Sequence, residues 1–193
     1  AWWKARHPPC DEQRLTQRNL YIIPTRVGAA FVLTQLLLLV ASINDQLNLG
    51  YALTFLLVGC GLASMHTTHG NLAGLRLTLQ PPEPGHLGED LLLRVRLHNT
   101  GRARYGLGLR LADAPSATLA FVDVPAQNNA ELVLAWRAPQ RGHLELPVLR
   151  IETRFPLGLF VAWSYWQPAA RQWVYPAVEL GAPPLPGGRS VDR

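Results

Sequence analysis

The sequence predicts a membrane-anchored, mainly β protein in which two transmembrane helices precede an antiparallel β-sandwich. Three observations lead to this fold class: two long uncharged runs lie near the start, apolar residues alternate at period two after them, and turn residues separate the alternating stretches. Only 16% of the 193 residues are charged, against about 25% in an average soluble domain. Hydrophobic residues make up 48%, which excludes intrinsic disorder, and the two cysteines exclude a disulfide scaffold.

The first segment, residues 1–20, is basic and carries an aromatic pair, Trp2 and Trp3. Pro8 and Pro9 interrupt any helix in this stretch, because proline lacks the backbone N–H and clashes with the preceding turn. We therefore expect a basic cytoplasmic segment that is a mobile tail and sets the orientation of the chain. The alternative is an interfacial amphipathic segment whose Trp side chains lie among lipid headgroups.

Two uncharged runs of seventeen residues follow, at 27–43 and 49–65, with a short polar turn between them at 44–48. A helix needs roughly 17–25 mostly apolar residues to span a bilayer. Two buried helices that are apolar on every face would need more protein around them than this chain supplies. A cleaved signal peptide does not fit either, because a second apolar run follows the first closely. Residues 21–70 are therefore predicted to form a two-helix transmembrane hairpin.

Lysine and arginine are distributed unevenly around these two runs. Five basic residues precede the first run, the turn has none, and the next basic residue after the second run is Arg76. The positive-inside rule therefore predicts that the N-terminus and everything after residue 65 lie in the cytoplasm. Cys10 and Cys60 agree with a reducing compartment, since one lies in the N-terminal segment and the other in a span.

The second run carries small residues at Gly59, Gly61 and Ala63. Small side chains let another helix approach closely in a membrane. Packing within the hairpin is the use we expect, and a homo-oligomer through this seam is the alternative. The lipid bilayer is the first partner that the sequence predicts.

From residue 72 onward the pattern changes to apolar–polar alternation at period two, which indicates strands. Turn residues separate the alternating stretches. Seven or eight short strands without an intervening helix predict an immunoglobulin-like sandwich at residues 71–180, although no Cys…Trp…Cys pattern of an antibody domain is present. A Pro/Gly-rich tail follows at 181–193. The predicted strands lie at 75–79, 93–97, 105–111, 119–124, 132–136, 144–153, 160–166 and 172–175.

Candidate chemistry is sparse. His66 and His69 are spaced so that one helix face could hold a metal ion, but two histidines without a third ligand make a poor site. No serine lies in a nucleophile elbow, and no glycine-rich loop ends in the Lys-Ser/Thr pair of a phosphate loop. Arginines on the predicted strands lack the interleaved aromatic residues of a nucleic-acid surface. We therefore expect no enzyme activity, no catalytic residue, no cofactor, no metal and no nucleic-acid partner.

The segment 155–160 is the most informative stretch of the soluble part. Its proline fixes one backbone angle and its glycine permits a positive one, so the segment can turn sharply while it presents apolar side chains. The first interpretation is a corner that closes the core between strands. The functional alternative is a hydrophobic docking ridge for a partner, because aromatic anchors are enriched at interfaces. The candidate docking residues are Phe155, Leu157, Phe160 and Trp163.

Several stretches are similar to the domain of unknown function 58 family. Residues 48–57 and 66–75 resemble the membrane hairpin and its exit, and 153–160 followed by 162–164 resemble the most recognisable stretch of the family. Val174, Tyr175 and Pro176 match the strand and proline that follow it. The matches run in the family's order from about Tyr21 to Pro176.

This resemblance implies a bacterial inner-membrane protein that is often encoded beside a MoxR-type AAA+ ATPase and a transglutaminase-like protein. Members of the family continue into an Arg- and Asp-rich segment and a domain resembling a von Willebrand A module, so we expect this chain either to be truncated or to depart from the family at this point. The function that follows is a non-catalytic anchor or scaffold that presents a cytoplasmic β-sandwich to partners in envelope or complex maturation. The alternative is the membrane-tethering portion of a larger protein whose metal-binding or catalytic activity lies in the missing C-terminal domain.

Overall fold

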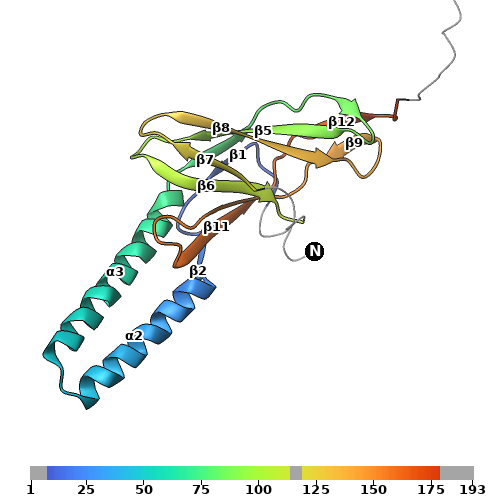
Figure 1. The fold of residues 1–193 in the computed structure, drawn as a ribbon. Coiled ribbons are helices and arrows are strands. Elements are labelled where there is room, and N and C mark those ends of the chain that lie inside the picture. Colours follow the sequence, from blue (N-terminus) through green and yellow to red (C-terminus); the bar gives the residue numbers. More distant parts are fainter. Residues whose placement is uncertain (1–7, 114–118, 179–193) are drawn as a thin grey trace, which may run out of the picture.

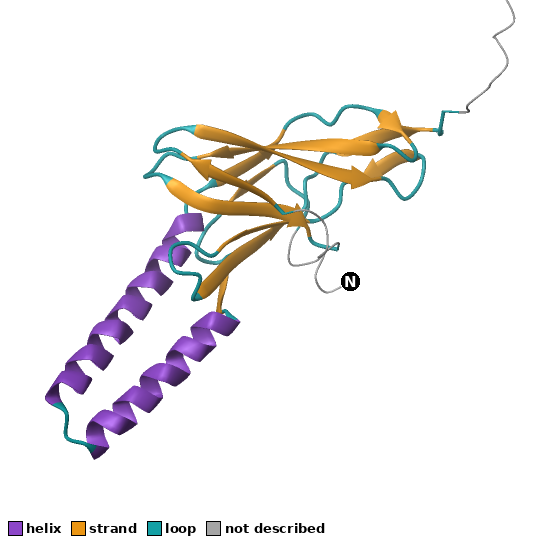
Figure 2. Ribbon diagram, viewed as in Figure 1, coloured by secondary structure: helices purple, strands orange, loops and turns teal. Residues whose placement is uncertain are grey.

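Two long helices project side by side from a set of β-sheets (Figure 1). This arrangement comes from a computed structural model, which describes residues 8–113 and 119–178. The predicted tail at 181–193 lies outside the described residues. The coarse prediction is confirmed, because two long apolar helices lie near the N-terminus and the rest of the described chain is mainly antiparallel β-sheet (Figure 2).

The helices are α2 (Arg26–Asn44) and α3 (Asn48–Leu72), joined by a three-residue turn. Helix α2 is 19 residues long and α3 is 25 residues long, which correspond to about 28 Å and 37 Å. The hydrocarbon core of a bilayer is about 30 Å thick. Helix α2 therefore matches that thickness, and α3 exceeds it by about 7 Å, which is between one and two turns.

The described residues also form three sheets, and every pair of neighbouring strands among them is antiparallel except β4 and β12, which are parallel. The four-stranded sheet has the order β1 (Glu12–Arg14), β3 (Arg76–Leu79), β5 (Asp90–His98), β8 (Asn129–Arg137). The five-stranded sheet has the order β2 (Tyr21–Pro24), β11 (Phe160–Trp166), β10 (Leu149–Thr153), β6 (Arg104–Leu111), β7 (Ala120–Val124). The three-stranded sheet has the order β4 (Gly85–His86), β12 (Arg171–Tyr175), β9 (Gly142–Glu145).

The buried side chains of the four- and five-stranded sheets share one hydrophobic core. Strand β5 alternates strictly, with Leu93, Val95 and Leu97 fully buried and the residues between them facing outward. This is the period-two pattern of a strand with one buried face. The last residue of α3, Leu72, also belongs to this core, so the helix enters the β-part rather than ending beneath it.

One predicted strand is divided in two. The stretch 144–153 contains the end of β9 and all of β10, and Pro147 lies between them. Proline has no N–H to donate to a neighbouring strand, so pairing stops there and the chain passes from the three-stranded to the five-stranded sheet.

The expectation of a mobile N-terminal tail is wrong for residues 8–20. Strand β1 pairs antiparallel with β3, and Leu15 is 1% exposed within the core. The backbone of Leu15 donates to the carbonyl of Leu75 and accepts from Gly74, both at 2.8 Å. The prolines do exclude a helix, but an extended segment can still add to the edge of a sheet. Residues 21–24, expected within the hairpin, form β2.

Candidate functional site: the junction between helices and sheets

The loop that connects β10 to β11, residues 154–159, lies between the β-side ends of the two helices; we name it the junction loop. Thr25 binds it from the α2 side. The Thr25 hydroxyl donates to the Gly158 carbonyl at 2.7 Å, and the Thr25 N–H donates to the Leu159 carbonyl at 2.8 Å. The same Oγ1 accepts from the Gly28 N–H at 3.1 Å, so Thr25 is also the N-cap of α2. One side chain thus begins a helix and holds the loop.

Helix α3 binds the same loop from the other side. The hydroxyl of Thr68, which is fully buried, donates to the Phe155 carbonyl at 2.8 Å. One turn further, Asn71 Nδ2 donates to the Tyr105 carbonyl at 2.7 Å and to Thr153 Oγ1 at 2.9 Å. These contacts fix the polar end of α3 to β6 and β10. The helix continues past the apolar run because its polar side chains find partners inside the β-part.

Gly28 permits the close approach of α2 to the junction loop. A Cβ atom at this position would lie 2.0 Å from the Leu159 carbonyl oxygen. No side chain can be accommodated at that distance without moving the backbone. The contact therefore requires glycine.

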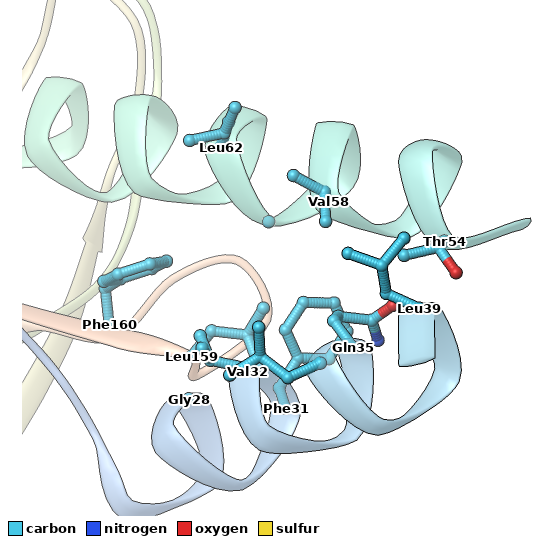
Figure 3. Close-up of a pocket in the computed structure, with 12 residues that line it drawn as sticks. Gly28, Phe31, Val32, Gln35, Leu39, Thr54, Val58, Leu62, Leu159 and Phe160 are labelled. Carbon is cyan, nitrogen blue, oxygen red and sulfur yellow. The ribbon is translucent and has the colours of Figure 1, made fainter. Parts of the chain in front are cut away.

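Below the junction loop, a groove of about 230 Å³ runs between the two helices (Figure 3). Its walls are apolar, with Val32 and Phe31 on α2 facing Val58 on α3, and Leu62 at the rim. Leu159 and Phe160 of the β-part close one end. Polar groups in the wall are Thr54 and Gln35, and Oε1 of Gln35 is buried without a hydrogen-bond partner.

The small residues of α3 divide between the two faces of the helix. A Cβ atom at Gly61 would lie 3.2 Å from the Phe31 ring, and one at Gly50 would lie 2.2 Å from the Ser42 hydroxyl, so both glycines pack against α2. Gly59 has nothing within 4 Å of its Cβ position. Packing within the hairpin therefore uses Gly61, as expected, while Gly59 faces outward.

The four candidate docking residues lie around this junction but do not form one ridge. Phe160 lines the groove, and Phe155 packs against the Tyr105 ring at 5.2 Å between centroids. Leu157, at the tip of the junction loop, is 58% exposed. Trp163 lies on the opposite face of β11 from Phe160, because side chains alternate along a strand.

Trp163 belongs to a charged and aromatic cluster on the outer face of the five-stranded sheet. Its ring stacks on Tyr21 at 5.8 Å between centroids, and the Arg150 guanidinium lies 4.8 Å from its ring centre. Glu152, 4% exposed, lies within 4 Å of three arginines. Arg150 Nε is 2.8 Å from Glu152 Oε2 but is not aligned for a hydrogen bond. The separations from Glu152 are 3.4 Å for Arg110, 2.8 Å for Arg150 and 3.7 Å for Arg154.

The remaining candidate groups are dispersed. Among the described residues, no three His, Cys, Asp or Glu side chains lie close enough to hold a metal ion, and His66 and His69 stand without a third ligand. Arg104 donates to the Ala73 carbonyl at 2.9 Å at the end of α3, and burial lowers the pKa of its guanidinium. The arginines considered for nucleic acid lie on separate surfaces, since Arg96 pairs with Glu131 on one sheet and Arg110 with Glu152 on the other.

Sequence reasoning missed the residues that build the junction, namely Thr25, Gly28, Thr68 and Asn71. Two signals were present in the sequence. The first is Thr25, two residues before the first apolar run, which is typical of an N-cap. The second is the set of polar residues that continue in helical phase after the second run. Comparisons with known protein families, with curated proteins and with solved structures gave no match.

Proposed function

We propose that this chain is a membrane-anchored scaffold, in which α2 and α3 cross the bilayer as a hairpin and hold an immunoglobulin-like β-sandwich at the cytoplasmic face. The observation that carries the proposal is the exposure of two long apolar helices. Only 17% of the most apolar window of each helix is buried, whereas the core helix of a soluble protein would be mostly covered. Leu37 and Phe55, for example, are 64% and 66% exposed.

The junction supports a scaffold rather than a loosely tethered domain. Thr25 at the start of α2 and Thr68 on α3 both donate hydrogen bonds to carbonyls of the junction loop. Asn71 on α3 donates two more, to Tyr105 and Thr153 of the five-stranded sheet. These hydrogen bonds are buried or partly buried, and they hold a fixed geometry because leaving such groups unpaired is costly. The β-part is then presented at one height and orientation above the bilayer.

The cellular setting rests on charge and on the family resemblance. The basic residues before α2 favour a cytoplasmic N-terminus and β-part. The resemblance to the domain of unknown function 58 family favours the bacterial inner membrane and a MoxR-type AAA+ ATPase as partner. On this proposal the chain has no catalytic role and positions that ATPase for envelope or complex maturation.

A binding experiment with defined components tests the proposal. The chain is reconstituted in lipid nanodiscs, and a purified MoxR-type AAA+ ATPase is titrated against these and against empty nanodiscs. Saturable binding to the loaded nanodiscs alone is the expected result. Absence of binding would contradict the ATPase as partner. The membrane anchor would be contradicted if alkaline carbonate treatment of membranes released the chain into the soluble fraction.

A further inference from the structure

The register of the five-stranded sheet brings three aromatic side chains to one level on its outer face. Tyr21 on β2 is opposite Trp163 on β11, and Trp163 is opposite Glu152 on β10. Glu152 is opposite Gly108 on β6, which is opposite Phe121 on β7. Tyr21 is 40% exposed and Phe121 is 64% exposed. We name the row Tyr21, Trp163 and Phe121 the aromatic row.

Apolar side chains lie between this row and the helices. Ile23, two residues nearer to α2 than Tyr21, is 50% exposed, and Val27 in the first turn of α2 is 63% exposed. Leu157, at the tip of the junction loop, is 58% exposed. The apolar surface of the helices therefore continues onto the end of the β-part.

Positive charge surrounds the aromatic row. Three arginines approach the single carboxylate of Glu152, so the cluster retains two positive charges. Arg154, whose side chain is 66% exposed, is the first residue of the junction loop and lies on the helix side of Glu152. Arg150, on the far side, stacks over Trp163. From α2 outward, the face thus passes from apolar to aromatic and arginine side chains.

We propose that this outer face binds the headgroup layer of the membrane and selects anionic phospholipid. The inference rests on the proposed crossing of the membrane by α2 and α3. Along an extended strand, Ile23 and Tyr21 lie roughly 7 Å and 14 Å from Thr25. A headgroup layer about 5–8 Å thick lies on each side of the hydrocarbon core. Ile23 and Leu157 then lie within the headgroup layer, and Tyr21 lies roughly 6–9 Å beyond its outer boundary, so the aromatic row borders the layer on the water side.

The order of side chains favours lipid over a soluble macromolecule. Aromatic residues form belts at membrane–water interfaces because their rings are amphipathic. Arginine makes charge-assisted hydrogen bonds to phosphate, and basic residues next to a span attract anionic lipid. A docking surface for a soluble partner has no reason to follow this order along the direction of a transmembrane helix.

Spin-label accessibility tests the depth of this face. Single cysteines are placed at Leu157, Ile23, Leu37 and Leu92 in a Cys10→Ser, Cys60→Ala background, and the protein is reconstituted in phosphatidylglycerol–phosphatidylcholine vesicles. Collisions with oxygen report lipid, and collisions with a water-soluble nickel chelate report solvent. Leu37, in the middle of α2, tests the crossing, and Leu92, 48% exposed on the opposite sheet, is the solvent control.

The labels at Leu157 and Ile23 are expected to favour oxygen, Leu157 more strongly, while the label at Leu92 favours the nickel chelate. If Leu37 reports lipid and both Leu157 and Ile23 report solvent, the inference is overturned and the anchor stands. If Leu37 itself reports solvent, the crossing fails and the inference fails with it.

Lipid retention tests the charge. Arg154→Gln is expected to reduce phosphatidylglycerol retained by the purified protein about fivefold, since a basic residue near an anionic surface contributes on the order of 1 kcal/mol. Arg154→Lys, which keeps the charge, and Arg94→Gln, an exposed site on the opposite sheet, are expected to retain it. Equal retention by Arg154→Gln and the native protein would overturn the assignment of anionic lipid.

Discussion

Asn71 and Tyr105 exchange a pair of hydrogen bonds: the Asn71 Nδ2 donates to the Tyr105 carbonyl at 2.7 Å, and the Tyr105 N–H donates to the Asn71 Oδ1 at 3.1 Å. In an antiparallel sheet, a residue of the neighbouring strand forms the same pair of hydrogen bonds, one to the carbonyl and one from the N–H. The amide side chain in the last turn of α3 therefore takes the place of a strand beside the start of β6. This contact makes helix and sheet one structural unit.

Asn71→Ala is expected to destabilise the protein by about 1–3 kcal/mol, because the N–H of Tyr105 loses its side-chain partner in a partly buried place and the Tyr105 carbonyl keeps only the longer bond from Thr153 Oγ1, at 3.3 Å. The control is Asn48→Ala, an exposed asparagine at the other end of the same helix, with an expected change below about 0.5 kcal/mol. Denaturant unfolding in detergent, followed by tryptophan fluorescence, measures both. Equal stability of the two variants would show that the Asn71 contact is not needed.

Gly28→Ala is expected to cost about 1–3 kcal/mol, since its Cβ would overlap the Leu159 carbonyl. Gly59→Ala is the matched control on the other helix, because its Cβ meets nothing within 4 Å and alanine is the better helix former. Thermal unfolding of the two variants in the same detergent distinguishes them. A neutral Gly28→Ala would mean that α2 does not contact the junction loop.

Thr25→Ala is expected to cost about 1–2 kcal/mol, because it removes the N-cap of α2 and the hydrogen bond to Gly158 together. Thr34→Ala is the control on the same helix, since the Thr34 hydroxyl is exposed and donates only to the Ala30 carbonyl one turn back. Chemical unfolding compares the two. A loss no larger than that of Thr34→Ala would contradict the role of Thr25 at the junction.

The thiol of Cys10 is expected to react slowly with iodoacetamide, because burial raises its pKa and alkylation proceeds through the thiolate. A raised pKa leaves less thiolate at a given pH, so the curve of alkylation rate against pH moves to higher pH. Thr100→Cys, at an exposed turn, serves as the reference in a Cys10→Ser, Cys60→Ala background. Coincident curves would contradict the packing of residues 8–20 against the sheets.

The elements that could be predicted are those whose burial leaves a pattern in their own residues. The alternation at 93–97 and 132–136 corresponds to β5 and β8, where one strand face is buried. The two uncharged runs lie within α2 and α3. A strand with one buried face shows alternation at period two, and a helix that is apolar on every face shows an unbroken apolar run. Both patterns are visible in the residues of the element itself.

The parts that could not be predicted depend on partners far away in the chain. Hydropathy ends the second apolar run at Met65, but α3 continues to Leu72 because Thr68 and Asn71 bind carbonyls of Phe155 and Tyr105. Strand β1 has three residues, too few for a period, and forms only because the edge of β3 is open to it. Neither partner can be identified from the neighbouring sequence.

The candidate site shows the same division. The segment 155–160 was recognised as a sharp turn, and its apolar side chains were considered as a docking ridge. The carbonyls of this segment, which bind Thr25 and Thr68, carry no sequence signal because every residue has one. The docking role of Leu157 and Trp163 stays a prediction.

The central claim is that α2 and α3 cross the membrane as a hairpin with the β-part in the cytoplasm. Labelling of single cysteines in intact bacterial cells with a membrane-impermeant maleimide tests it most directly. Asn48→Cys, beside the turn between the helices, should react in intact cells, and Arg137→Cys on β8 should react only after the inner membrane is opened. Reaction of Arg137→Cys in intact cells, with Asn48→Cys protected, would reverse the orientation, and reaction of both in intact cells would contradict the hairpin.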